Sequence, residues 1–340
     1  MEHRVERAID VGYGWTKFST SNAFIVDAKI TIDVQAFQSL PMPVTREAFD
    51  LSTSSEYKGM SVLVKLKDSA YLVSDAPTYS ADALRVRGSN YSSTEQYEVC
   101  MAAAVKAMKV SCLDHLVVGT PVGDYESTKA VLKAKFGKGI DVDGKAVEIR
   151  NLHVVAQPVG GLVWHYYSKG LQSQLVQQPR LLVDVGHGTL DWVAVQGLKT
   201  NFDRSGSVRL GVSHFVDRVV EEIKGVKGLE DVSFSDQVDQ MLLLNKPLPF
   251  GDQSFRFEDF QSLIEQIASR GVQHIESSIG DLRMYQSVVL MGGGAPLYKV
   301  ALGKAFKTTR IEIVDNARFA NVRGFQLLAE RQAQMKKPFS

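Results

Sequence analysis

Two aspartates, Asp10 and Asp184, each stand at the end of an apolar run and are followed by closely spaced glycines. A carboxylate buried at a strand end is costly unless a cation, a metal or hydrogen-bond donors accompany it. Glycines allow backbone N–H groups to converge on an anion at close range. A carboxylate beside converging N–H groups suits a phosphate that carries magnesium. Either motif alone is equally typical of an ordinary hairpin, so the interpretation depends on both.

The two motifs repeat one pattern. Asp-Val-Gly-Tyr-Gly at residues 10–14 aligns with Asp-Val-Gly-His-Gly at residues 184–188, and a threonine follows each copy. Apolar runs flank the glycines in both places, which predicts two buried strands joined by a tight turn. Two copies so far apart in the chain indicate two similar halves that face one ligand, each with a carboxylate and a glycine turn.

Two further segments could complete the site. A strand ends at Gln157 and Pro158 begins a helix, so the Gln157 side chain is expected to face the ligand. The alternative for Gln157 is a helix-start residue that is hydrogen-bonded to the backbone. The triple glycine at residues 292–294 follows a buried strand and precedes a helix. There it would let a flat ring or a phosphate lie against the main chain, although a flexible connector is the alternative.

Length and composition describe an ordinary globular chain. Its 340 residues allow two domains, 44% of them are apolar, and the net charge of +1 argues against a generally basic nucleic-acid binder. The seven histidines and two cysteines lack zinc-ligand spacing, and neither a Walker A motif nor a Gly-x-Ser-x-Gly elbow is present. The charged first segment and the lack of a long apolar run predict a cytoplasmic protein without signal peptide or membrane contact.

Strands and helices alternate along the chain, most clearly between residues 93 and 155. This alternation predicts an α/β architecture in which helices cover the sheets. The small residues Gly160 and Gly161 after Pro158 allow a helix to pack closely. We interpret this segment as the passage from one domain to the other.

Taken in order, the motifs resemble those of the actin-like ATPase superfamily. Residues 10–17 look like its first phosphate motif, 156–161 its connecting motif, 184–191 its second phosphate motif and 290–295 its adenosine motif. Within the superfamily the chain is most similar to the plasmid-partitioning actins of the ParM/StbA family, which includes protein D of PRTRC plasmid systems. The Asp-Val-Gly-Tyr-Gly start and the ending at residues 316–324 carry this likeness.

The resemblance implies two actin-like (ribonuclease H-like) domains, each a mixed sheet flanked by helices, with a nucleotide cleft between them. The domains would comprise residues 1–156 and 157–317, and a C-terminal helix at 318–332 would pack back on the first domain. The resemblance also implies an ATPase that polymerises into filaments with ATP and magnesium. Hydrolysis of the ATP would make these filaments unstable. A filament end would capture an adaptor protein bound to centromere-like plasmid DNA, without direct sequence-specific DNA binding by the chain.

The same resemblance assigns roles to residues. Asp10 and Asp184 would hold magnesium through its water molecules and act in catalysis, and Gln157 would position the attacking water. ParM itself typically has glutamate where this chain has Gln157, and because an amide is a poor base, we expect slow or filament-triggered hydrolysis. The residues expected to contact the nucleotide are Gly12, Tyr13, Gly14, Trp15, Thr16, Lys17, Gly186, His187, Gly188, Thr189, Asp191, Gly292, Gly293, Gly294 and Ala295.

Other functions stay open at this point. A small-molecule kinase of the same superfamily needs a carboxylate base near its acceptor, and Gln157 stands where that base would be expected. A chaperone-like ATPase would need a peptide-binding domain for which the chain has little room. A nucleotide-binding scaffold that forms no filaments is the non-enzymatic alternative. Lys17 either adds charge beside the phosphates or is a solvent-facing strand residue.

Overall fold

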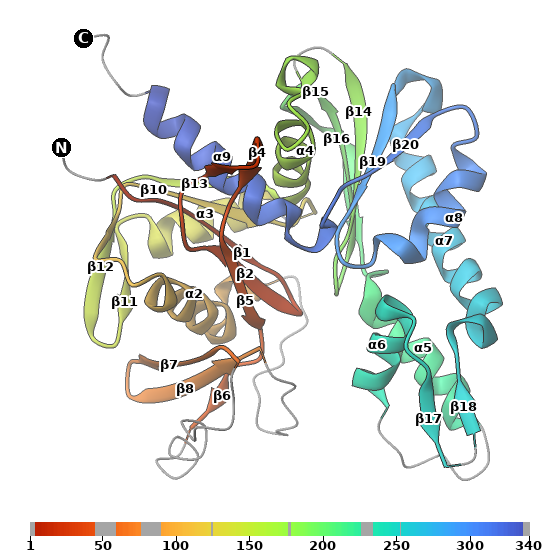
Figure 1. The fold of residues 1–340 in the computed structure, drawn as a ribbon, viewed down its shortest axis with the longest axis horizontal. Helices are drawn as coiled ribbons and strands as arrows, with labels where there is room; N and C mark the ends of the chain where they lie inside the picture. The colour runs from red at the N-terminus through yellow and green to blue at the C-terminus, as the bar shows by residue number, and fades with distance from the viewer. Residues whose placement is uncertain are drawn as a thin grey trace. The chain divides into compact units, whose positions relative to one another are not determined.

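The computed structural model describes residues 4–44, 59–75, 90–123, 125–175, 178–225, 234–251 and 253–335. The chain forms two compact units, Met1–Gln172 together with Phe319–Ser340, and Ser173–Arg318. Each unit contains a five-stranded sheet with helices (Figure 1). The division differs from the expected boundary after residue 156. Helix α4 (Gln157–Tyr167) packs against helix α9 (Ala320–Met335), and both therefore belong to the first unit.

The central sheet of the first unit has the order β13-β10-β1-β2-β5. Its strands are β1 (Glu6–Val11), β2 (Trp15–Ser19), β5 (Val34–Gln38), β10 (His115–Thr120) and β13 (Leu152–Ala156). β1, β10 and β13 run parallel, whereas β2 and β5 are antiparallel additions to β1. Side chains alternate along a strand, so Ile9 and Val11 point into the core beneath α2 (Glu95–Met108) and α3 (Tyr125–Phe136), and Ala8 points toward α9.

Smaller elements surround this sheet. They are the ribbon β3 (Phe24–Val26) and β4 (Lys29–Thr31), a three-stranded sheet of β6 (Met42–Pro43), β7 (Ser61–Leu66) and β8 (Ser69–Ser74), and a second one of β9 (Cys112–Leu113), β11 (Gly139–Val142) and β12 (Lys145–Ile149). The 3-10 helix η1 (Tyr91–Ser93) precedes α2. Both cysteines, Cys100 and Cys112, are free thiols.

The sheet of the second unit has the order β16-β15-β14-β19-β20. Its strands are β14 (Pro179–Val185), β15 (Leu190–Gln196), β16 (Lys199–Val208), β19 (Ser287–Met291) and β20 (Arg310–Ile313). The helices are α5 (Val212–Lys224), α6 (Ser235–Leu244), α7 (Gln261–Ile279) and α8 (Ala295–Ala305), and β17 (Leu248–Phe250) pairs with β18 (Gln253–Phe255). One hydrophobic core joins these helices to one face of the sheet. No helix in the described ranges is both long and apolar enough to cross a membrane.

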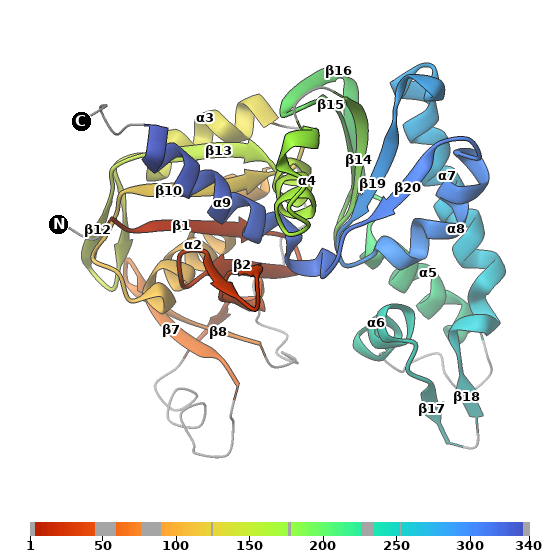
Figure 2. The ribbon, with the colours of Figure 1, turned by 45° about the horizontal axis from the view of Figure 1, so that its top comes forward.

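The two sheets have the same topology (Figures 1 and 2). In each, a central strand, β1 or β14, forms an antiparallel hairpin with the next strand and pairs in parallel with a strand far along the chain. A third antiparallel strand and a second parallel strand then complete each sheet. The repeated motifs of the sequence therefore occupy equivalent places, because each glycine turn joins the first two strands of its sheet.

Helices α4 and α9 cross at glycines. A Cβ atom on Gly324 would overlap the backbone oxygen of Gly160, and one on Gly160 would overlap the backbone oxygen of Asn321. Asn321 in turn accepts a hydrogen bond from the Gly161 N–H at 3.1 Å. Glycine is needed at these positions because the two backbones approach more closely than any side chain allows.

We expect Gly324→Ala to destabilise the protein by about 1–3 kcal/mol, the usual range for overpacking a close contact. Gly303→Ala is the matched control, since this helical glycine of α8 has no atom within 4 Å of an added Cβ. That variant should be neutral or more stable by about 0.5–1 kcal/mol, because alanine favours helix. Denaturant unfolding of both variants tests the contrast, and equal stabilities would contradict the proposed backbone contact.

Helix α6 carries a carboxylate, Asp239, whose buried Oδ1 atom has no hydrogen-bond partner in the described part of the chain. Burial raises the pKa of Asp239 to about 6 from an ordinary value of 3.8; Asp236 adds to this shift and Arg318 opposes it. Between these two values the folded state holds a proton that the unfolded chain has lost. The free energy of unfolding therefore falls as the pH rises through this window.

We expect Asp239→Asn to raise the thermal midpoint at a pH above the shifted pKa, where the wild-type protein must bury a charge. The gain should disappear at a pH below the ordinary value, where Asp239 is neutral in both states. Asp203→Asn, at an exposed position of β16 that does not contribute to the Asp239 shift, is the control and should change the midpoint little. A loss of stability in Asp239→Asn above the shifted pKa would show that attraction to Arg318 outweighs burial.

Candidate functional site

Asp10 lies at the end of β1 and is almost fully buried, with 1% of its surface exposed. It stands opposite Lys17 in the β1–β2 hairpin, and Lys17 Nζ lies 3.1 Å from its Oδ2 atom. The Gly12 N–H donates to the Trp15 carbonyl at 3.1 Å and closes the turn between the strands. The buried carboxylate thus has a cation beside it, and Lys17 faces Asp10 rather than solvent.

Gln157, the first residue of α4, completes this group. Its Nε2 atom donates to Asp10 Oδ1 at 2.7 Å, so its side chain is bonded to a carboxylate, and the backbone-bonded alternative is not observed. The carboxyl ends of the parallel strands β1, β10 and β13 meet at one edge of the sheet, which brings residues 147 positions apart in the chain into contact.

Gly119 on β10 makes room for this contact. A Cβ atom there would lie 2.5 Å from the Phe325 ring and 2.8 Å from Gln157 Cγ. This glycine is not among the predicted site residues. A glycine in the last position but one of a buried strand is the signal that could have indicated it, because such glycines often mark a close approach.

Polar and aromatic side chains pack against the buried side of the first turn. Thr16 is buried, and its hydroxyl lies 2.8 Å from that of Ser39, whose N–H donates to the Gly14 carbonyl at 2.9 Å. The Tyr13 ring stacks on Tyr91 with 4.7 Å between ring centroids. Burial raises the pKa of Tyr91, which therefore stays neutral. The Thr16 side chain thus supports the turn from inside the fold.

Two further groups beneath the turn are held uncharged. Burial raises the pKa of the Cys100 thiol to about 12, so this cysteine is unreactive. Burial also raises the pKa of Tyr97, and the charge of Asp10 adds to the effect. Both side chains lie on the buried side of the turn, and they do not take part in acid–base chemistry at neutral pH.

The second turn follows the same design. Asp184 stands opposite Asp191 in the β14–β15 hairpin, and the Gly186 N–H donates to the Thr189 carbonyl at 2.9 Å, as Gly12 does to Trp15 in the first turn. The Thr189 hydroxyl donates to Asp191 Oδ2 at 2.5 Å. Asp191 therefore holds the side chain of the turn threonine.

The first residues of α5 hold the second turn in place. The N–H groups of Val212 and Ser213 donate to the carbonyls of Gly186 and His187 at 3.0 and 2.8 Å. A Cβ atom on Gly211 would lie 2.5 Å from the Thr189 nitrogen, so this glycine lets the helix start reach the turn. Gly211, the N-cap of α5, is a second site residue that was not predicted, and a glycine directly before a helix is the signal that could have indicated it.

The triple glycine lies directly against Asp184. β19 runs parallel to β14 with Met291 beside Asp184, and the Gly294 N–H donates to the Val185 carbonyl at 3.0 Å. Gly292 has a φ of +87°, and a Cβ atom there would overlap Asp184 Oδ1. Gly293 has no atom within 4 Å of the corresponding position and borders open space. The glycines therefore form a structured turn, and the flexible connector is not observed. Ala295 follows as the buried first residue of α8.

The predicted site residues thus fall into two groups, one in each unit. Asp10, Lys17, Gln157 and the first turn lie together at the end of β1, and Asp184, Asp191, the second turn and the triple glycine lie together at the end of β14. In both groups a carboxylate at a strand end precedes a turn. The N–H of the first turn glycine donates to the carbonyl of the residue three positions later.

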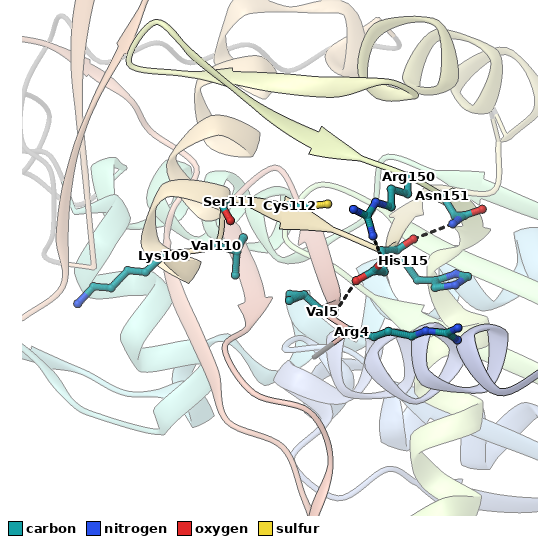
Figure 3. Close-up of a pocket in the computed structure, with 10 residues that line it drawn as sticks. Arg4, Val5, Lys109, Val110, Ser111, Cys112, His115, Arg150 and Asn151 are labelled. Atoms are coloured by element: carbon teal, nitrogen blue, oxygen red, sulfur yellow. Dashed lines mark hydrogen bonds and ion pairs between the residues drawn. The ribbon is translucent and has the colours of Figure 1, made fainter. Parts of the chain in front are cut away.

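A separate cavity in the first unit contains none of the predicted residues. It is lined by Arg4, Cys112, His115 and Arg150, among others, at the opposite ends of β1 and β10 from Asp10 (Figure 3). Burial opposes ionisation of Asp114 there, but the Val5 N–H at 2.8 Å and Arg150 at 2.7 Å outweigh it and lower its pKa. This carboxylate is therefore hydrogen-bonded to Val5 and ion-paired with Arg150 within the first unit.

The family models match both units. Residues 8–160 match the N-terminal domain of actin-like proteins, and residues 182–304 match the C-terminal domain of archaeal MreB-like actin homologues. The chain is a member of the actin-like superfamily. No curated protein sequence matches it.

Solved structures of the superfamily have the same fold over nearly the whole chain. The archaeal actin homologue Ta0583 has a TM-score of 0.73 at 21% identity, with 96% of this chain and 99% of that chain covered. The pSK41 ParM protein, in its apo form, has a TM-score of 0.63 at 18% identity, with 98% and 99% covered. A 15-stranded ParM filament from Clostridium botulinum has a TM-score of 0.70 at 17% identity, with 96% and 99% covered. The predicted two-domain actin-like fold is confirmed, and ParM proteins are among the structures that share it.

We expect Gly292→Ala to destabilise the second unit by about 1–3 kcal/mol, because it combines a positive φ with an overlap on Asp184. Gly293→Ala is the matched control at the next position, where an added Cβ meets nothing. Thermal unfolding of the two variants should separate them clearly. Equal midpoints would show that the main chain at Gly292 moves away from Asp184 without penalty.

Proposed function

We propose that this protein is an actin-like ATPase that binds ATP with magnesium through its two glycine turns and polymerises into filaments for plasmid DNA segregation. The observation that carries the proposal is the duplicated site. In each unit a carboxylate, Asp10 or Asp184, precedes a turn closed by the same backbone hydrogen bond. Two such turns are suited to hold opposite sides of a triphosphate, since each offers backbone N–H groups.

The residues fit magnesium as the accompanying ion. Asp10 and Asp184 are 1% and 6% exposed. In the described ranges, no group of three or more His, Cys, Asp and Glu side chains could hold an ion directly. Magnesium keeps several water ligands and needs only one or two carboxylates in a phosphate site. When bound, it would neutralise the charge of the phosphates, and Asp10 and Asp184 would hold its water molecules.

Gln157 is suited to orient a water molecule and unsuited to take its proton. Its amide N–H is used by Asp10, which leaves the Oε1 atom to accept a hydrogen bond from water. Since a neutral amide is a poor general base, hydrolysis would depend on positioning and charge stabilisation. The bond to Asp10 fixes the orientation of the amide. Because the site lacks a strong base at this position, we infer a slow basal reaction that assembly accelerates by completing the site.

The comparisons support the nucleotide and the filament. Ta0583, which has the same fold, has been crystallised with ADP, and the ParM protein of Clostridium botulinum and the Alp12 protein form filaments. We infer that this chain also assembles with itself in the cytoplasm. Its net charge of +1 is too small for general DNA binding, so plasmid DNA would be reached through an adaptor protein.

The test is sedimentation and phosphate release with ATP, ADP and a non-hydrolysable analogue. We expect high-speed pelleting with ATP and with the analogue, loss of polymer with ADP, and phosphate release without any acceptor. Transfer of phosphate to a small molecule without pelleting would instead identify a small-molecule kinase. Nucleotide binding without either activity would identify a scaffold.

We expect Gln157→Ala to slow phosphate release by about 100-fold, the usual effect of losing a positioned group, while nucleotide binding stays near wild type. Gln261→Ala, at the exposed first position of α7, is the matched control and should leave turnover unchanged. Single-turnover phosphate release and titration with a fluorescent ATP analogue separate the two effects. Wild-type turnover in Gln157→Ala would remove this residue from the mechanism.

A further inference from the structure

The β3–β4 ribbon of the first unit exposes three apolar side chains in a row. Phe24, Ile25 and Val26 are 40%, 67% and 46% exposed, although each is a residue type that is usually buried. The ribbon is a two-stranded sheet that no third strand joins in the described part of the chain. Exposed apolar residues on an open strand edge mark a site for pairing with another strand.

The ribbon is held firmly at its base. The Ala23 N–H donates to Glu330 Oε1 of α9 at 2.7 Å, and Asn22 Nδ2 donates to Glu6 Oε2 of β1 at 3.0 Å. At its tip, Asp27 and Ala28 have φ angles of 49° and 60°. A left-handed alanine costs about 1–2 kcal/mol, so the ribbon retains a tight turn at some expense in stability. The apolar strand is therefore presented on a fixed support.

The two edges of the ribbon differ in protection. β4 carries Lys29, an exposed charge of the kind that natural sheets use to prevent edge pairing. β3 carries no charge between Phe24 and Val26. The unprotected edge is also self-complementary, because antiparallel pairing of two copies centred on Ile25 places Phe24 opposite Val26 and Ile25 opposite Ile25. Only apolar residues then meet, and a strand of mixed charge or polarity would be a poorer partner.

We propose that β3 pairs antiparallel with β3 of a second copy of this chain about a two-fold axis at Ile25. Such a contact uses the same surface on both copies. Three residues a side form a small interface, well below the roughly 1,000 Å² that a stable dimer needs. Two single molecules therefore bind each other only weakly through this contact. In a filament, the existence of which rests on the proposed function, the contact repeats along the polymer. Many weak contacts then join neighbouring filaments side by side through multivalency.

Disulfide trapping tests the pairing without nucleotide. In an antiparallel pair, directly opposite residues have Cβ atoms about 4.5–5.5 Å apart, close enough for a disulfide after small adjustment. In a Cys112→Ser background, which leaves only the buried Cys100, Ile25→Cys should form disulfide-linked dimers under mild oxidation at high protein concentration. Lys29→Cys, on the protected edge of the same ribbon, should remain monomeric. Equal cross-linking of both variants, or none at Ile25→Cys, would overturn the proposal.

Sedimentation at two speeds tests the consequence for filaments. Ile25→Asp should keep high-speed pelleting with ATP and lose low-speed pelleting of bundles, because the charge blocks only lateral pairing. Leu244→Asp, which alters an exposed apolar residue of the second unit, should keep both. Bundling by Ile25→Asp, or wild-type binding to anionic lipid vesicles that Ile25→Asp abolishes, would overturn the proposal. If the wild-type protein forms no filaments, the proposed function fails, and the cross-linking result still decides the ribbon.

Discussion

The candidate site of the first unit depends on a carboxylate that the fold buries at the end of a parallel strand. A buried charge of this kind is stable only when its partners are held in place. Lys17 supplies the opposite charge from the neighbouring strand, and Gln157 supplies an N–H from the start of a helix. Since both partners come from regular elements, the geometry around Asp10 follows from the order of the strands in the sheet.

The carboxylate of the second unit has different surroundings. Asp184 is enclosed by the triple glycine and by a turn whose carbonyls accept from the start of α5. Glycine at Gly292 and Gly211 lets backbone approach where any side chain would collide. The two sheets thus share one topology, but their strand-end carboxylates have different surroundings. The first unit places a side chain beside its carboxylate, whereas the second places a glycine main chain beside it and leaves open space at Gly293.

Much of this arrangement could be predicted because its signals are local. The Asp-Val-Gly-x-Gly repeats, the Gln-Pro step and the triple glycine each follow an apolar strand, and composition and order were sufficient to place them at strand ends. Gly119, Gly211 and Ser39 were not recognised, because each acts through a contact with a distant segment. A single glycine or serine in an apolar run carries no local sign of what will pack against it.

The amino-acid sequence by itself determined the elements, the duplication and the residues that end each central strand, since these follow from hydrophobic periodicity and from glycine and proline. Only the tertiary structure decided that Gln157 bonds to Asp10, that Lys17 faces the same carboxylate, and that α4 belongs with α9 in the first unit. The physical reason is that these features depend on distances between segments far apart in the chain. Backbone packing at Gly160 and Gly324 and the parallel pairing of β1, β10 and β13 set those distances.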